Sequence, residues 1–142
     1  MTIPQESIDM ARIAGQAAVD HLAENVIALN VSQQMVLTDI FVLASADSER
    51  QVQGVVKGIE EEMLKHGHKM VRREGEAGAR WVLMDFTDIV VHVQHAEDRE
   101  FYALERLWRD APVVDLQLDH GGGANADTSE TVGSADRASD QA

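Results

Sequence analysis

The chain has 142 residues, 44% of them hydrophobic, which is enough for one domain with a single core, but no apolar run approaches the ~20 residues that cross a bilayer. It has no cysteine, which excludes disulfides, thiolate zinc sites and cysteine nucleophiles, and its N-terminus lacks the features of a signal peptide, so we expect a cytoplasmic protein. Its formal charge of −13 repels phosphate backbones, which argues against direct nucleic-acid binding and favours a basic protein as the partner.

The first half of the chain predicts two helices with two strands between them. In chain order these are a helix over residues 4–24, strands over 26–31 and 39–44, and a helix over 48–66. Apolar residues spaced three and four apart indicate the helices. The second strand is apolar almost throughout, which is typical of a strand buried on both faces. Ser48 and Gln51 have the spacing of a capping box, which marks the start of the second helix.

The second half predicts three strands and a third helix. The strands span residues 69–73, 80–85 and 88–94, and the helix runs from about Glu97 to just before Pro112. The last two strands are so close in sequence that they must form a hairpin. The element order therefore predicts a single α/β domain with a mixed sheet of about five strands and three helices packed on it.

The C-terminal residues differ in composition from the rest. From Asp119 onward Gly, Ala, Ser, Asp and Thr dominate and aromatic residues are absent. This composition predicts a disordered acidic tail over residues 119–142, after an α/β domain over residues 1–118. The tail holds five acids and one base, a charge of −4, which leaves −9 of the total −13 on the domain.

The hairpin carries the most informative side chains. With Phe86 and Thr87 as a two-residue loop, the pairs expected on one side of the sheet are Asp85 with Asp88, Leu83 with Val90, and Trp81 with His92. Such a row could anchor a partner, with Trp81 as the buried aromatic and the two carboxylates receiving Lys or Arg. The alternative is that a helix covers the row and that His92 is a histidine at the edge of the core.

The same residues admit two chemical alternatives. His92 and His95, with Asp85 and Asp88, resemble a metal-ligand set. Residues three apart on a strand point to opposite faces, however, so the two histidines should diverge. Paired carboxylates could also hold magnesium for phosphoryl transfer, but the chain has no glycine-rich loop before a helix to cradle a phosphate. We therefore predict no bound metal, no cofactor and no catalytic residue.

The third helix offers both core and contact positions. Phe101, Leu104 and Trp108 lie on its core stripe, whereas Tyr102 and Glu105 are three apart on the adjacent face and could reach a partner. Arg99 could instead pair with Asp85 or Asp88 across the domain. The carboxylates would then be an internal brace and not a docking site.

Several blocks of this sequence match a known family in order and in spacing. They are residues 39–44 (D-I-F-V-L-A), 48–52 (S-E-R-Q-V), 81–92 (W-V-L-M-D-F-T-D-I-V-V-H) and 99–108 (R-E-F-Y-A-L-E-R-L-W). Over about residues 7–112 the chain resembles the ribosomal silencing factor family, also called the Iojap or RsfS family. The tail after residue 118 departs from the family pattern.

The resemblance implies a nucleotidyltransferase-like α/β fold without the transferase active site. It implies binding to the large ribosomal subunit through ribosomal protein fourteen of that subunit, which blocks joining of the small subunit and lowers protein synthesis when nutrients are scarce. It also implies a homodimer when the protein is free. The rival hypotheses are a nucleotide- or metal-dependent enzyme on the same fold, and an adaptor for another basic protein. The candidate partner-binding residues are Trp81, Leu83, Asp85, Asp88, Val90, His92, Tyr102 and Glu105.

Overall fold

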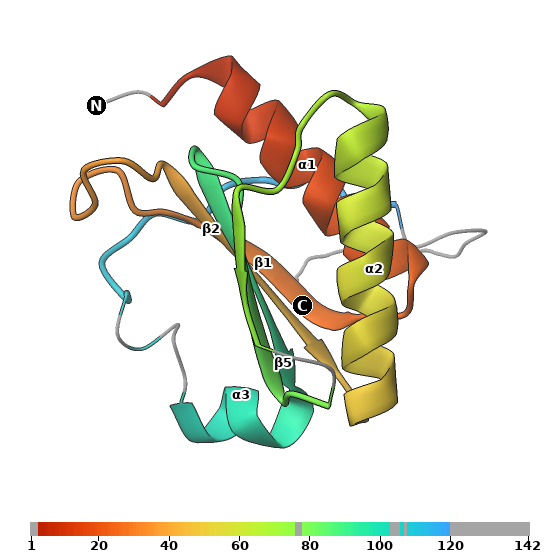
Figure 1. Ribbon diagram of the computed structural model, residues 1–142. Coiled ribbons are helices and arrows are strands. Elements are labelled where there is room, and N and C mark those ends of the chain that lie inside the picture. Colours follow the sequence, from red (N-terminus) through yellow and green to blue (C-terminus); the bar gives the residue numbers. More distant parts are fainter. Residues whose placement is uncertain (1–2, 76–77, 103–105, 107, 120–142) are drawn as a thin grey trace.

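The computed structural model describes residues 3–75, 78–102, 106 and 108–119 (Figure 1). Its elements are α1 (Gln5–Asp20), β1 (Glu24–Asn30), β2 (Ile40–Ala46), α2 (Glu49–Lys65), β3 (Arg72–Glu74), β4 (Trp81–Asp85), β5 (Ile89–His95) and α3 (Ala96–Tyr102). The element order is the one predicted. The expected disordered tail lies outside the described residues, apart from Asp119. None of the helices in these ranges is long and apolar enough to span a bilayer.

The five strands form one sheet in the order β1-β2-β5-β4-β3. Strand β5 is central and runs parallel to β2, and each of the other neighbouring pairs is antiparallel. Every residue of β2 is buried, as its apolar sequence predicts. The mixed five-stranded sheet with three helices is thus confirmed, while the finer nucleotidyltransferase-like assignment stays a prediction.

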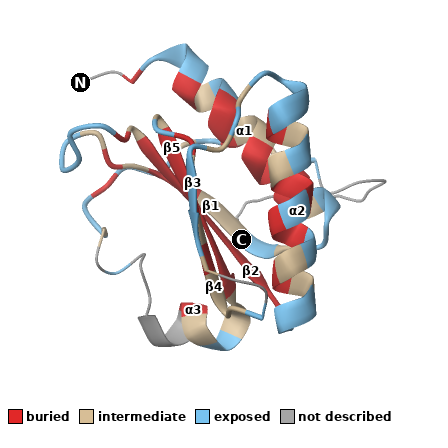
Figure 2. Cartoon of the chain, in the orientation of Figure 1, coloured by how far each residue is buried: buried red, intermediate tan, exposed pale blue. Residues whose placement is uncertain are grey.

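Helices α1 and α2 cover one face of the sheet (Figure 1). The core beneath them is apolar and includes Met10 and Ala14 of α1, Ile59 of α2 and Met84 of β4, and all four are buried. Figure 2 shows this burial along the inward sides of both helices, with exposed residues on their outer sides. The small side chains of α1, mainly alanines, let this helix lie close to the sheet and to α2.

A smaller cluster lies on the opposite face of the sheet. Phe41, Leu43 and Val90 are buried there, and Trp81 and Trp108 pack partly buried against them. The rings of Phe41 and Trp108 meet edge to face with centroids 5.2 Å apart. Helix α3 contacts β5 and β2, on the side of the sheet away from α2 (Figure 1). Among the described residues, this face therefore has a thinner cover than the face under α1 and α2.

Two predicted boundaries were wrong by several residues. Helix α1 ends at Asp20 and not near Glu24, because the chain turns at Leu22, which has a φ of 71°, and enters β1. Strand β3 starts at Arg72, later than the predicted residue 69, and all three of its residues are exposed. The predicted start of α2 is confirmed, since the Ser48 hydroxyl accepts a hydrogen bond from the Gln51 backbone N–H at 3.1 Å.

The segment after Trp108 closes one edge of the sheet. Val113 forms a bridge with Leu29 of β1, and the Val114 N–H donates to the carbonyl of Ala28 at 2.9 Å. Leu116 then packs against Gly15 of α1, where an added Cβ would lie 3.0 Å from its side chain. These contacts satisfy backbone groups of an edge strand that would otherwise be open to another chain.

Candidate partner-binding face

The row expected on the hairpin exists. Trp81, Leu83 and Asp85 of β4 are half-buried and alternate with fully buried Val82 and Met84, which face the α1 and α2 core. This alternation follows from the two-residue period of a strand. The row therefore lies on the thinly covered face, where its side chains reach both the small cluster and solvent.

The predicted pairing within the hairpin was wrong by two residues. Leu83 pairs with His92 and Asp85 with Val90, and the three residues 86–88 connect the strands. Phe86 is buried in the main core and cannot sit at the tip of a two-residue loop. Thr87 takes a φ of 73°, and the Asp85 carboxylate accepts its backbone N–H at 2.8 Å, which fixes the longer turn. A shift of two residues keeps every side chain on its expected face.

The two carboxylates are therefore not directly opposite each other. Asp88 lies in the connection, where its carbonyl accepts the Asp39 N–H at 2.8 Å. A carboxylate oxygen of Asp85 lies 3.9 Å from a guanidinium nitrogen of Arg72, whose closer contact is with Glu74. The Asp85 side chain is a quarter exposed, so its charge remains accessible at the surface.

His92 is buried beneath the row. The Trp81 indole N–H donates to His92 Nδ1 at 3.2 Å, and the rings of Phe41 and His92 meet edge to face with centroids 5.0 Å apart. Burial lowers the pKa of His92 from its ordinary 6.5 to about 4, so the ring is neutral at pH 7. With Nδ1 as the acceptor, the proton sits on Nε2, which is buried and has no partner among the described residues. Val90 is also buried, so these two side chains support the row from below.

Gln94 continues the row at the other end of β5. It pairs with Trp81 in the ladder and is fully buried. Neither its amide nitrogen nor its amide oxygen has a hydrogen-bond partner within the described part of the chain. Buried amides are normally satisfied, so this side chain is unusual for a residue serving only the core.

The proposed brace between Arg99 and the hairpin carboxylates is not formed. Arg99 is buried and donates to the Ser45 hydroxyl at 3.3 Å. Ser45 pairs with Gln94, whereas Asp85 pairs with Val90, four residues earlier on β5. Four residues of strand span about 13 Å, so Arg99 sits at the wrong end of the sheet for Asp85.

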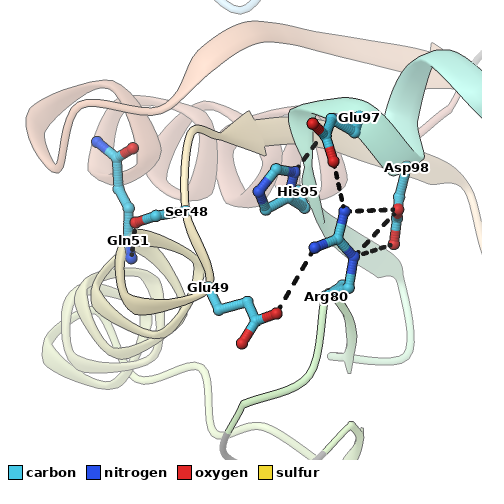
Figure 3. Close-up of polar contacts among 7 residues, drawn as sticks. All are labelled: Ser48, Glu49, Gln51, Arg80, His95, Glu97 and Asp98. Carbon is cyan, nitrogen blue, oxygen red and sulfur yellow. Dashed lines mark hydrogen bonds and ion pairs between the residues drawn. The ribbon is translucent and has the colours of Figure 1, made fainter.

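A different arginine ties α3 to the rest of the domain. Figure 3 shows the Arg80 guanidinium between Glu49 at 3.6 Å, Glu97 at 3.0 Å and Asp98 at 3.2 Å. Hydrogen bonds to Asp98 and then to Glu97 raise the pKa of Arg80 above its ordinary value. This network holds the first turns of α2 and α3 beside the start of β4, which fixes α3 over the buried end of the row.

The contact positions expected on α3 cannot be placed. Tyr102 has a described helical backbone only, and Glu105 lies outside the described residues, as does Leu104. The side chain of Phe101 is also outside the described part. Trp108, predicted to be a core residue, is confirmed as a partly buried member of the smaller cluster.

Nothing in the described ranges gathers three or more metal-ligating side chains at one point. His92 points into the smaller cluster, while the His95 ring nitrogen Nδ1 accepts the Glu97 N–H at 3.2 Å at the end of the strand (Figure 3). The divergence expected for these two histidines is thus present.

One apolar surface was missed in the sequence. Met35, Val36 and Leu37 lie in the loop between β1 and β2 and are exposed, as is Val71 before β3. The sequence does contain an indication of this surface. Three consecutive large apolar residues follow a polar segment, and a loop does not require apolar residues for its structure.

Comparisons of the sequence with a family model and with curated proteins point to the same family. The family model described as "Ribosomal silencing factor during starvation" matches residues 4–141. Ribosomal silencing factor RsfS of Halalkalibacterium halodurans is 39% identical over 109 residues, which cover 77% of this chain and 93% of that protein. The mouse protein "Mitochondrial assembly of ribosomal large subunit protein 1" is 33% identical over 90 residues, covering 61% of this chain and 39% of that protein.

A solved structure supports the same relationship. A crystal structure of a protein from Chromobacterium violaceum is similar with a TM-score of 0.68 and 32% identity, covering 71% of this chain and 84% of that one. The similarity thus holds in sequence and in three dimensions over the domain that carries the hairpin row. The chain belongs to the ribosomal silencing factor family.

Proposed function

We propose that this protein binds the large ribosomal subunit and prevents the small subunit from joining it, which lowers protein synthesis when nutrients are limited. The observation that carries the proposal is the family match over residues 4–141. The name of the mouse relative, which refers to assembly of the large subunit, supports that subunit as the target. The protein acts in the cytoplasm as a binding protein, without catalysis, cofactor or membrane contact.

The proposed partner within that subunit is ribosomal protein fourteen. The formal charge of −13 supports a basic protein surface over RNA, because an acidic domain and a phosphate backbone repel each other. The half-exposed Trp81, Leu83 and Asp85 supply an aromatic, an aliphatic and a charged contact in one row. Asp88 extends the row, and Tyr102 and Glu105 remain proposed contact positions on the neighbouring helix.

The buried members of the row have a supporting part in this proposal. His92 accepts the indole N–H of Trp81 and so fixes the orientation of the aromatic contact. Val90 fills the space beneath Leu83 and Trp81 in the smaller cluster. Inhibition is then steric: a bound domain near the subunit interface occupies space that the small subunit needs. In the free protein we propose a homodimer.

Sucrose-gradient sedimentation tests the function directly. Purified protein is mixed with large subunits alone, with small subunits alone, and with both under conditions that favour joining. We expect the protein to sediment with large subunits only, and the fraction of assembled ribosomes to fall as protein is added. Protein that stays at the top of the gradient, or an unchanged assembled fraction at saturating concentration, would contradict the proposal.

The identity of the contact protein needs a separate measurement. Isolated ribosomal protein fourteen, immobilised on a surface, should capture the chain with 1:1 stoichiometry. Binding to large subunits without binding to isolated protein fourteen would leave the ribosomal function standing and remove this partner.

A further inference from the structure

The loop between β1 and β2 presents large apolar side chains to solvent. Val36 is 97% exposed, Leu37 75% and Met35 36%, and Val71 from the segment before β3 is 68% exposed. Single exposed apolar residues are common on protein surfaces, but adjacent ones mark interaction sites. The other large exposed apolar side chains of the described residues, Leu22, Leu64 and Val113, lie elsewhere on the fold.

Hydrogen bonds hold this loop in a defined shape. The Asn30 side chain accepts from both the backbone N–H and the hydroxyl of Ser32, at 3.0 and 2.6 Å. The carbonyl of Val31 accepts the N–H groups of Gln34 and Met35, at 3.0 and 2.9 Å. These bonds fix the backbone of residues 30–35 next to β1, which reduces the entropy that this part of the loop loses on binding.

The loop forms one wall of a groove beside the hairpin. The groove has a volume of about 630 Å³. Its main lining residues are Met35, Val36, Leu37, Val71, Asp85 and Thr87. The Val71 N–H donates to the carbonyl of Asp85 at 2.8 Å, which holds Val71 beside the hairpin on the side of the groove opposite the loop. Asp85 is the one ionisable side chain among the described lining residues, so the groove is apolar with a carboxylate at its edge.

We infer that this groove, which we call the loop groove, takes a large apolar side chain and an adjacent Lys or Arg from a basic protein of the large subunit. The inference rests on the proposed function and extends its surface, because Asp85 belongs both to the hairpin row and to the groove. The apolar side chain packs against Val36, Leu37 and Val71, and the cation meets Asp85. An apolar anchor beside a charge-assisted contact is the usual composition of an energetic centre of an interface.

Charge and composition disfavour the other occupants. Residues 120–142 contain one large apolar residue, Val132, and four acids against one Arg, so the chain's own end does not match an apolar groove with a carboxylate. A second copy in this groove would place an acidic chain against Asp85. Four exposed side chains also fall well short of the ~800 Å² per partner that a stable dimer needs. Ribosomal RNA would place phosphates against Asp85.

The test uses a double variant, Val36→Ser with Leu37→Ser, in the full chain. Both side chains are exposed, so the melting temperature should stay within a few degrees of the wild type. The Kd for purified large subunits should rise about tenfold or more. The matched control is Leu64→Ser, which removes an exposed leucine from α2 outside the groove and should bind as the wild type does. A variant that binds as tightly as the wild type would overturn the inference.

A charge pair at one position identifies the kind of partner. Val36→Lys and Val36→Glu both remove the apolar contact, but a basic protein should bind the Lys variant several times more weakly than the Glu variant. Tighter binding of the Lys variant, or groove-dependent binding to protein-free large-subunit RNA, would mean an RNA occupant and overturn the inference. Loss of self-association with unchanged subunit binding would mean a second copy and also overturn it. Wild-type protein that fails to bind large subunits at all would instead overturn the proposed function on which the inference rests.

Discussion

The two faces of the sheet differ in whether they contain buried polar side-chain atoms that lack a hydrogen-bond partner among the described residues. Under α1 and α2 the core cluster is apolar, with Ile59, Met63 and Met84 among the fully buried side chains. On the other face lie His92 Nε2 and both polar atoms of the Gln94 side chain, which are the buried side-chain atoms without hydrogen-bond partners among the described residues. The first face has the apolar composition of a stable core, whereas the second departs from it by burying these polar atoms.

The departure has a cost in stability. A buried polar group without a partner costs about 1–3 kcal/mol relative to a satisfied or apolar one. A face serving only the core would carry apolar side chains at such positions, as the inward side of β4 does with Val82 and Met84. We therefore interpret the thinly covered face as shaped by binding, and the helix-covered face as shaped by folding.

The largest expected effect belongs to the helix-covered face. Met84→Ala should lower the free energy of unfolding by about 2–5 kcal/mol, because it leaves a cavity in a closely packed core. Urea denaturation followed by circular dichroism measures this change. Leu64→Ala, at an exposed position, is the control and should change it by less than about 0.5 kcal/mol. A similar small change for both variants would mean that Met84 does not lie in a closely packed core.

The second prediction concerns the pH dependence of the thinly covered face. The pKa of His92 is about 4 in the folded protein and 6.5 in the unfolded chain, so the unfolded state binds more protons between these values. Stability contributed by neutral His92 is complete above pH 6.5 and is lost as the pH falls towards 4. The shift corresponds to a loss on the order of 3 kcal/mol.

The measurement compares the wild type with His92→Gln over pH 4–7. Carboxylates titrate in both proteins, so only the difference between the two curves reports His92. We expect the wild type to lose more unfolding free energy than the variant between pH 6.5 and 4. Parallel curves would mean that the folded protein admits a proton at His92 without cost, and that this face is more open than its burial indicates.

The sequence predicted the fold well because hydrophobic periodicity is local. The spacing of apolar residues in α1 and α2, and the capping box at Ser48, depend on neighbours within one or two turns. The hairpin pairing depends on whether the Phe86 side chain lies at the tip of the turn or in the main core. Tertiary packing decides its burial in the core. The edge contact of Val113 with β1 also joins residues far apart in the chain, and no local pattern indicates it.

The candidate site was predictable in part for the same reason. Alternation along β4 places Trp81, Leu83 and Asp85 on one face whatever the pairing, so the row did not depend on the turn. One partner of Arg99 is Ser45, 54 residues away, and this contact follows from the parallel pairing of β2 with β5. The groove at Met35–Leu37 joins a loop to a hairpin across the sheet, which the sequence order does not reveal.

The third prediction reverses the usual sign of a core substitution. Gln94→Leu should raise the free energy of unfolding by about 1–2 kcal/mol, because it replaces a buried amide that has no hydrogen-bond partner among the described residues with an apolar side chain of similar size. Ser45→Ala, at the paired position on β2, should lower it, since Ser45 is a partner of buried Arg99 and donates to the carbonyl of Glu24. Destabilisation by both variants would mean that Gln94 has a partner in the folded protein, and the contrast between the faces would lose its main support.

The last prediction has the smallest expected effect on stability. It concerns Asp85, where a substitution should weaken binding and leave folding almost unchanged. Asp85→Asn should change the free energy of unfolding by no more than about 0.5 kcal/mol, because its Arg72 contact is long and exposed and the amide oxygen can still accept the Thr87 N–H. Asp115→Asn is a matched control, since Asp115 accepts the Gln117 N–H in the same kind of turn, at 2.9 Å, away from the row. Binding to large subunits should weaken about tenfold for Asp85→Asn and stay unchanged for Asp115→Asn, because only the first loses a charge-assisted contact to a basic partner. Thermal melts and subunit pull-downs on the two variants measure both effects.

If Asp85→Asn melted several degrees lower and bound normally, the Asp85 carboxylate would serve folding and not binding. The contacts with the partner would then have to be sought at Trp81 and in the loop groove.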